Sequence, residues 1–125
     1  MSQPLSQTPL IHPTAIIDPT ATVEPGVSIG PYSVVGPQCH IQSGTTIGAH
    51  VVLECNTKIG TDCTIASGAV LGGLPQDLNF KQEETWVEIG NKTVIRECVT
   101  INRATGEQAV TRIGDNCFIM AYTHL

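Results

Sequence analysis

The feature that most constrains the fold is a branched aliphatic residue at every sixth position. Counted in steps of six from Ile11 to Leu125, 17 of 20 positions hold Ile, Leu or Val. The run is unbroken for eleven positions, fails at Asp77 and Glu83, resumes in the same phase, and fails once more at Glu107. Apolar residues on a helix recur every 3.6 positions, so this pattern does not describe a helix.

Two other columns of the repeat support the same interpretation. The residues four places after the aliphatics are small: Ala15, Ala21, Val27, Ser33, Cys39, Thr45, Val51, Thr57, Cys63, Ala69, Thr93, Val99, Cys117 and Thr123. Three places after the aliphatics, turn-forming residues recur at Gly26, Gly44, Asn56, Asp62, Gly68 and Asn116. Gly, Asn and Asp tolerate the positive φ of a tight turn, so each hexad predicts a short strand followed by a corner.

These columns predict an all-β chain that winds as a parallel β-helix. The large aliphatic and the small residue of each hexad point inward, and identical columns stack at the inter-strand spacing of about 4.8 Å. Three hexads complete one coil of a triangular prism, and each coil is stable only against its neighbours. We expect residues 1–10 to form a lead-in and residues 11–125 to form the β-helix.

The breaks in the repeat predict two inserted loops, at 72–88 and 103–112. The first contains the only Trp of the chain, and the second is polar. Insertions in a solenoid leave the core and project from it, often on the binding face. Candidate binding residues are therefore sought first at these two loops.

Composition excludes several classes of function. A net charge of -5, from 6 Lys and Arg against 11 Asp and Glu, disfavours nucleic acid as a partner. No stretch of the sequence is long and apolar enough to predict a membrane span. The N-terminal residues do not resemble a signal peptide, so we expect a cytoplasmic chain whose five cysteines are reduced thiols.

Few polar residues stand out as candidates for chemistry. No zinc-type spacing of Cys or His is present, so no metal site is predicted. His124, close to the second loop, could form a hydrogen bond with a sugar hydroxyl or a phosphate. The polar cluster at residues 76–79 is either a binding element or loop surface. Arg103 could bind a phosphate or carboxylate, or pair with Glu97 or Glu107.

Several segments in register with the hexads carry a family resemblance. They are Gly73-Leu74-Pro75-Gln76-Asp77-Leu78, Val87-Glu88-Ile89-Gly90, Ile95-Arg96-Glu97, Val99-Thr100-Ile101-Asn102-Arg103 and Ala121-Tyr122-Thr123-His124-Leu125. Together they resemble the acyl-[acyl-carrier-protein]–UDP-N-acetylglucosamine O-acyltransferase family of lipid A biosynthesis. The resemblance implies a left-handed β-helix, a hand that the spacing does not reveal, and a homotrimer with sites between subunits.

The resemblance also implies a reaction and a set of site residues. A histidine acts as general base on the sugar 3-hydroxyl, which attacks the thioester of the acyl carrier protein without a cofactor or metal. That base is the second His of an H-x-x-H stretch. Because His124 matches the first, the base is expected two residues beyond Leu125, and this chain by itself is expected to be inactive. Asp77, His124, Gln76 and Asn102 are the expected contacts of UDP-N-acetylglucosamine.

Two positions depart from the family pattern, and three alternatives remain open. Asn79 stands where a lysine is expected, with Lys81 as its possible substitute, and Asn102 stands where a histidine is common. The alternatives are the N-acyltransferase of the same pathway, an enzyme like the γ-class carbonic anhydrases, and a non-catalytic β-helix scaffold. The first has a uridine-binding domain ahead of its hexads, and the second needs three His at one site.

Overall fold

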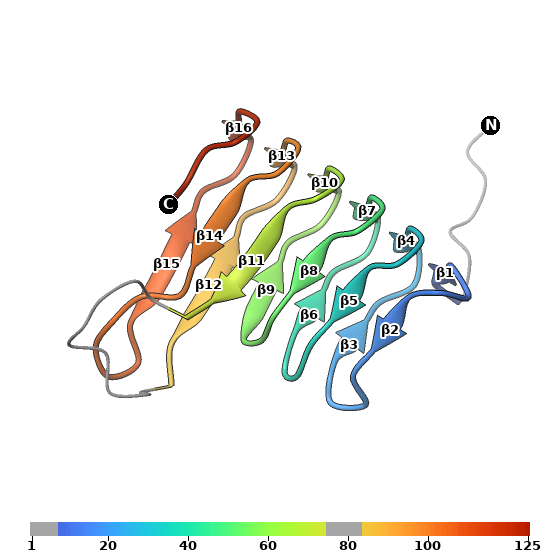
Figure 1. The fold of residues 1–125 in the computed structure, drawn as a ribbon, viewed down its shortest axis with the longest axis horizontal. Helices are drawn as coiled ribbons and strands as arrows, with labels where there is room; N and C mark the ends of the chain where they lie inside the picture. The colour runs from blue at the N-terminus through green and yellow to red at the C-terminus, as the bar shows by residue number, and fades with distance from the viewer. Residues whose placement is uncertain (1–7, 75–83) are drawn as a thin grey trace.

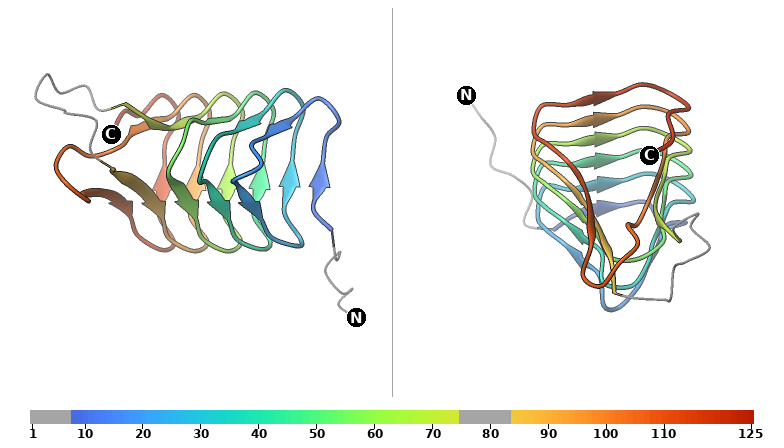
Figure 2. Two further views of the ribbon diagram at one scale, coloured as in Figure 1. Left: turned by 90° about the horizontal axis from the view of Figure 1, so that it is seen from below. Right: turned by 90° about the vertical axis from the view of Figure 1, so that its left-hand side faces the viewer.

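The computed structural model describes residues 8–74 and 84–125 as a left-handed parallel β-helix. The coils follow one another along a single axis (Figure 1), and the view along that axis has a three-sided outline (Figure 2). Within the described residues, no helix is long and apolar enough to cross a membrane. The predicted all-β class and the left-handed β-helix are confirmed.

In the described part of the chain, sixteen short strands build the three walls. They are β1 (Leu10–Ile11), β2 (Ile16–Ile17), β3 (Thr22–Val23), β4 (Ser28–Ile29), β5 (Val34–Val35), β6 (His40–Ile41), β7 (Thr46–Ile47), β8 (Val52–Leu53), β9 (Thr57–Ile59), β10 (Thr64–Ile65), β11 (Val70–Gly73), β12 (Trp86–Ile89), β13 (Val94–Ile95), β14 (Thr100–Asn102), β15 (Val110–Ile113) and β16 (Phe118–Ile119).

Every third strand joins the same parallel sheet. Sheet A contains β1, β4, β7, β10, β13 and β16, sheet B contains β2, β5, β8, β11 and β14, and sheet C contains β3, β6, β9, β12 and β15. Regular coils pair residues 18 apart, as in Ile47 with Ile65. Across the first interruption Ile65 pairs with Ile95, and across the second Ile95 pairs with Ile119. These steps of 30 and 24 are multiples of six, so the repeat stays in phase.

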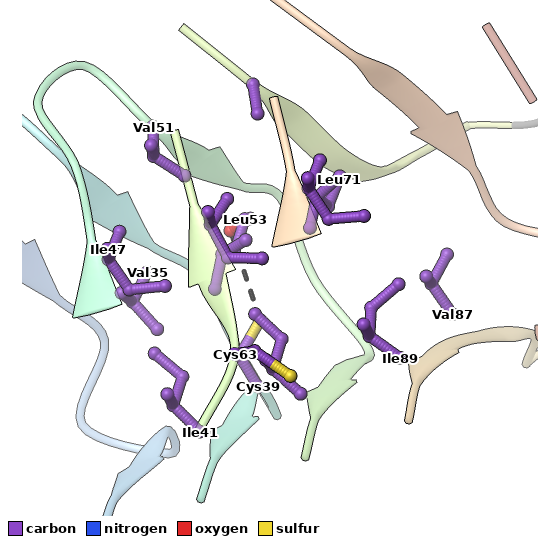
Figure 3. Close-up of a cluster of buried hydrophobic side chains, with 14 of the residues drawn as sticks. Val35, Cys39, Ile41, Ile47, Val51, Leu53, Cys63, Leu71, Val87 and Ile89 are labelled. Carbon is purple, nitrogen blue, oxygen red and sulfur yellow. Dashed lines mark hydrogen bonds between the residues drawn. The ribbon is translucent and has the colours of Figure 1, made fainter. Parts of the chain in front are cut away.

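The inward columns form one continuous core (Figure 3). Leu53, Ile59 and Leu71 are fully buried, as the six-residue repeat predicts. In the small column, hydroxyl groups bond the carbonyls of the next coil: Thr45 Oγ1 donates to the Gly60 oxygen over 2.7 Å and accepts from the Cys63 amide over 3.0 Å. Small polar residues therefore fit inside the prism because the neighbouring backbone satisfies them.

The corners adopt the left-handed backbone predicted from Gly, Asn and Asp. Asn56 and Asp62 have φ of 49° and 56°, respectively. The same conformation occurs at Tyr32 and Tyr122, whose types do not favour it. Many corner amides bond the preceding coil, as the Tyr122 amide does to the Glu97 carbonyl over 3.0 Å. Stacking of the coils therefore imposes the turn where the local sequence does not.

Candidate functional site

Both interruptions of the repeat leave the prism at the same corner. β11 ends at Gly73 in sheet B and β12 begins at Trp86 in sheet C; one coil later β14 ends at Asn102 and β15 begins at Val110. The strand ends that flank the two interruptions therefore lie on adjacent coils, at the lower left of Figure 1. β11 and β12 reach two and three residues into the predicted range 72–88, and β15 reaches three residues into 103–112, whereas β14 ends just before that range.

Arg103, which directly follows β14, links the strand ends at which the two interruptions begin. Its backbone amide donates to the Gly73 carbonyl over 2.9 Å, and its side-chain Nε donates to the Gly72 carbonyl over 3.0 Å. Gly72 has φ of 82°, and a Cβ at this position would collide with Thr57 and the Cys55 carbonyl. A glycine is therefore required where the chain turns out of the coil beside Arg103.

His124 lies on the outward face of sheet B, beside the last strand of that sheet. Its backbone forms a parallel bridge with Thr100 of β14, and Thr100 Oγ1 lies 2.7 Å from His124 Nδ1. The Asn102 side chain follows two residues along β14 on the same face. Sheet B thus brings together two of the residues expected to contact the sugar nucleotide, His124 and Asn102.

The Glu54 carboxylate adds a further polar group to this face of sheet B, on the side of the preceding coils. A Cβ built on Gly73 would lie 2.7 Å from Glu54 Oε2 and 3.0 Å from Asn102 Oδ1, so both oxygens converge over this glycine. Glu54 directly follows β8, whose inward Leu53 pairs with Leu71 of β11. Glu54, Asn102, Thr100 and His124 form what we call the sheet B polar row, which offers hydrogen-bond acceptors and donors to a polar ligand.

Sequence reasoning identified only part of this row. His124 and Asn102 were expected, whereas Asp77 and Gln76, together with Asn79 and Lys81, lie outside the described residues. Thr100 and Glu54 were missed. Glu54 carried one usable signal: it occupies the position after the inward aliphatic, where Gly36 stands one coil earlier in sheet B.

The other histidines have local partners away from this row. His40 Nε2 lies 2.6 Å from Glu24 Oε2 on sheet C, and His50 stacks on Tyr32 with ring centroids 5.3 Å apart. His50 has φ of 55° and therefore lies at a corner of the prism. Among the residues that the structure describes, no three His, Cys, Asp or Glu side chains gather to hold a metal ion.

The five cysteines are free thiols. Cys39 and Cys63 are buried in the small inward column, as expected. Burial raises the pKa of the Cys39 thiol to about 11, and burial likewise raises the pKa of Cys63. A thiol becomes a nucleophile only as the thiolate, so these two groups fill the core rather than carry out chemistry.

Comparisons with known proteins agree with this geometry. A family model described as the GMPPB C-terminal domain matches residues 6–105. The acyl-[acyl-carrier-protein]–UDP-N-acetylglucosamine O-acyltransferase of Thermodesulfovibrio yellowstonii is 47% identical over 116 residues, which are 92% of this chain and 45% of that protein. The enzyme of the same name from Synechocystis is 60% identical over 75 residues, 60% of this chain and 27% of that protein.

Solved structures of UDP-N-acetylglucosamine acyltransferases are similar to this chain as well. LpxA from Acinetobacter baumannii superposes with a TM-score of 0.90 at 46% identity, over 93% of this chain and 45% of that one. Francisella novicida UDP-N-acetylglucosamine acyltransferase gives 0.90 at 35% identity, over 93% and 43%. The chain thus spans about half the length of these two structures. The chain therefore belongs to the GMPPB C-terminal domain family, and over nine-tenths of its length it is similar to the N-terminal half of the acyl-[acyl-carrier-protein]–UDP-N-acetylglucosamine O-acyltransferases.

Proposed function

We propose that this chain provides the sugar-nucleotide side of an O-acyltransferase active site. The reaction moves an acyl group from acyl carrier protein to the 3-hydroxyl of UDP-N-acetylglucosamine. The sugar oxygen attacks the thioester carbonyl, the carbon–sulfur bond breaks, and the hydroxyl proton passes through a general base to the departing thiol. We place the step in the cytoplasm, at the start of lipid A biosynthesis.

One observation carries this proposal. Relatives that bear this activity in their names match more than nine-tenths of the chain. In the proposal, His124 and Asn102 of the sheet B polar row bind the sugar nucleotide, and Asp77 and Gln76 contact it from the first interruption. The general base is assigned to the family's second His, which lies outside this sequence.

We further propose that the functional unit is a homotrimer with its sites between subunits. The outward residues of sheet B support this because they are apolar along four coils: Ile16, Val34, Val52 and Val70. Ile16 is 64% exposed, and on sheet A Phe118 and Met120 are 59% and 69% exposed. Rows of exposed apolar side chains of this kind mark surfaces that associate with other proteins.

The test is acyl transfer by the polypeptide of the complete reading frame, supplied with acyl-[acyl-carrier-protein] and UDP-N-acetylglucosamine. We expect activity in the wild type, and a loss of at least tenfold in kcat/KM in His124→Ala and Asn102→Ala, since each removes a hydrogen bond to substrate. Gln42→Ala, on sheet C, is the matched control and should keep wild-type activity.

A second measurement separates binding from chemistry. A polypeptide of residues 1–125 should fold and bind UDP-N-acetylglucosamine but transfer no acyl group, since the proposed base lies beyond it. Robust transfer by this polypeptide would contradict the assignment of the base. With the complete polypeptide, transfer to the free amino group of an added glucosamine nucleotide, and none to the hydroxyl of UDP-N-acetylglucosamine, would identify the N-acyltransferase alternative instead.

A further inference from the structure

We propose that Thr100 is a positioning residue for His124. Its hydroxyl donates a hydrogen bond to Nδ1 of the imidazole and holds the neutral ring in the tautomer that carries its proton on Nε2. The two side chains meet on the outward face of sheet B, with 2.7 Å between Thr100 Oγ1 and His124 Nδ1. The evidence for the hydrogen bond is this geometry, whereas the role of the bond in ligand binding rests on the proposed function.

The main chain brings these two groups together. The Thr100 amide donates to the Thr123 carbonyl over 3.0 Å, and the Leu125 amide donates to the Thr100 carbonyl over 2.9 Å. His124 is therefore fixed between two backbone hydrogen bonds. Thr100 is β-branched and lies in β14, where its side-chain torsion is restricted. Little conformational freedom has to be lost to form the side-chain bond.

The two tautomers of His124 differ in which of the two side chains donates the Thr100–His124 hydrogen bond. A neutral imidazole has one N–H donor and one acceptor nitrogen, and a hydroxyl has one proton. Within the described residues, neither Thr100 Oγ1 nor His124 Nε2 has a second hydrogen-bond partner. If the hydroxyl donates to Nδ1, only the Nε2 proton remains unpaired. In the opposite tautomer Nδ1 donates to the hydroxyl, and the hydroxyl proton and the Nε2 lone pair turn to solvent. The contact is exposed, so water can pair these groups in both arrangements, and the assignment of the hydroxyl as donor is part of the proposal that the tautomer measurement decides.

This arrangement defines what His124 offers to a ligand. With its proton on Nε2, the neutral ring presents a directed N–H donor, which suits a phosphate or hydroxyl oxygen of a sugar nucleotide. Because Nε2 already carries the proton in this arrangement, it has no lone pair with which to accept another, and Nδ1 is engaged by Thr100. His124 is thereby suited to binding, and the general base must be another group.

Nitrogen-15 NMR of the histidine rings in the 125-residue chain tests the bond directly. We expect wild-type His124 to show an unprotonated Nδ1 and a protonated Nε2. Thr100→Val keeps the shape of the side chain but removes the hydroxyl, and it should give a mixture of tautomers; Thr100→Ser should restore the wild-type signature. Thr64→Val, at the matching outward position of sheet A, is the control and should change nothing at His124.

A protonated Nδ1 in the wild type, or wild-type tautomers in Thr100→Val, would overturn the inference. If Thr100→Val does not fold, the wild-type and Thr100→Ser spectra still decide it. Titration of the same samples with UDP-N-acetylglucosamine tests the role in binding, where Thr100→Val should bind about tenfold more weakly and Thr100→Ser normally. Equal affinities overturn the positioning role. If the wild type does not bind, the proposed function fails while the NMR result stands.

Discussion

Sheets B and C share one interior but present different outward faces. Both bury the same repeat of Ile, Leu and Val side chains. Outward, sheet B carries in register Ile16, Val34, Val52, Val70 and Thr100, with His124 beside the last. Sheet C carries Thr22, His40, Lys58, Glu88 and Arg112.

The difference separates two tasks within one repeat. The inward residue of each hexad specifies the coil, and it is the same kind of residue in both sheets. The outward residue is free to vary because it touches solvent or a partner. On sheet C, Lys58, Glu88 and Arg112 line a shallow groove of about 270 Å³ and include an ion pair. On sheet B, the apolar row leads into the polar row at His124, as expected of a surface that meets a partner and a ligand.

The largest expected effect is a loss of stability that is equal on the two sheets. Leu53→Ala in β8 and Ile59→Ala in β9 each remove a fully buried side chain, and each should lower the free energy of unfolding by about 2–5 kcal/mol. The adjacent outward change Lys58→Ala should cost no more than about 0.5 kcal/mol. Urea titration checks all three; equal losses at inward and outward positions would refute the assignment of the columns.

A second prediction compares an inward thiol with an outward one. Burial raises the pKa of Cys39 to about 11, whereas the unfolded thiol ionises at its ordinary, lower pKa. As pH rises through this window, the unfolded chain loses the proton and the folded chain keeps it. Stability therefore falls with rising pH, by about 2–3 kcal/mol at pH 11, and is unaffected below pH of about 8.

Urea titrations between pH 7 and pH 11 measure this effect. Cys39→Ala should lose that part of the pH dependence. Cys98 is exposed at a corner, so Cys98→Asn should retain the wild-type slope. Asn is chosen because it tolerates the left-handed backbone that Cys98 adopts. The same slope in wild type and Cys39→Ala would show that Cys39 is not the responsible group.

A third prediction tests whether the sheet B face associates. Val34→Asp places a charge in the apolar row and should weaken self-association roughly tenfold or more, since burying a valine contributes about 1.5–3 kcal/mol. Thr22→Asp introduces the same charge on sheet C and should leave the oligomer intact. Sedimentation velocity measures the oligomeric state of each variant. A monomeric wild type, or dissociation caused by Thr22→Asp, would contradict the proposal that the chain associates through sheet B and not through sheet C.

The smallest expected effect concerns the ion pair on sheet C. Arg112 and Glu88 lie 3.2 Å apart, and their side chains are 68% and 37% exposed. Solvent screens such a pair, so Arg112→Ala should change stability by at most about 1 kcal/mol, and less in high salt. Thermal unfolding at low and high salt measures it. A larger loss would mean that the outward face of sheet C contributes to folding.

The repeat predicts the fold because each column reports one physical requirement. Ile59 and Leu71 lie inward, Cys39 fits the small column, and Asn56 turns the corner, as the sequence indicates. Tyr122 was not predicted at a corner because its residue type opposes positive φ, and only the stacked coil makes the turn favourable.

The site is less predictable because the residues that meet on neighbouring coils depend on how many residues each interruption adds to the step between those coils. A repeat of six stays in phase whether the step between coils is 18, 24 or 30 residues. Thr100 meets His124 only because that step is 24, which the phase of the repeat does not reveal. The convergence of Glu54 and Asn102 on Gly73 likewise depends on the step of 30 between β11 and β14. His124 was singled out from its place near the second loop and from the family resemblance, and Asn102 from the resemblance.

The most direct test of the account is to map UDP-N-acetylglucosamine onto the chain by amide NMR shifts. Saturable shifts should concentrate at Thr100, Asn102 and His124 on sheet B, with none at Lys58 or Arg112 on sheet C. Shifts centred on the sheet C groove, or no saturable binding at all, would contradict the claim that the polar row of sheet B holds the sugar nucleotide.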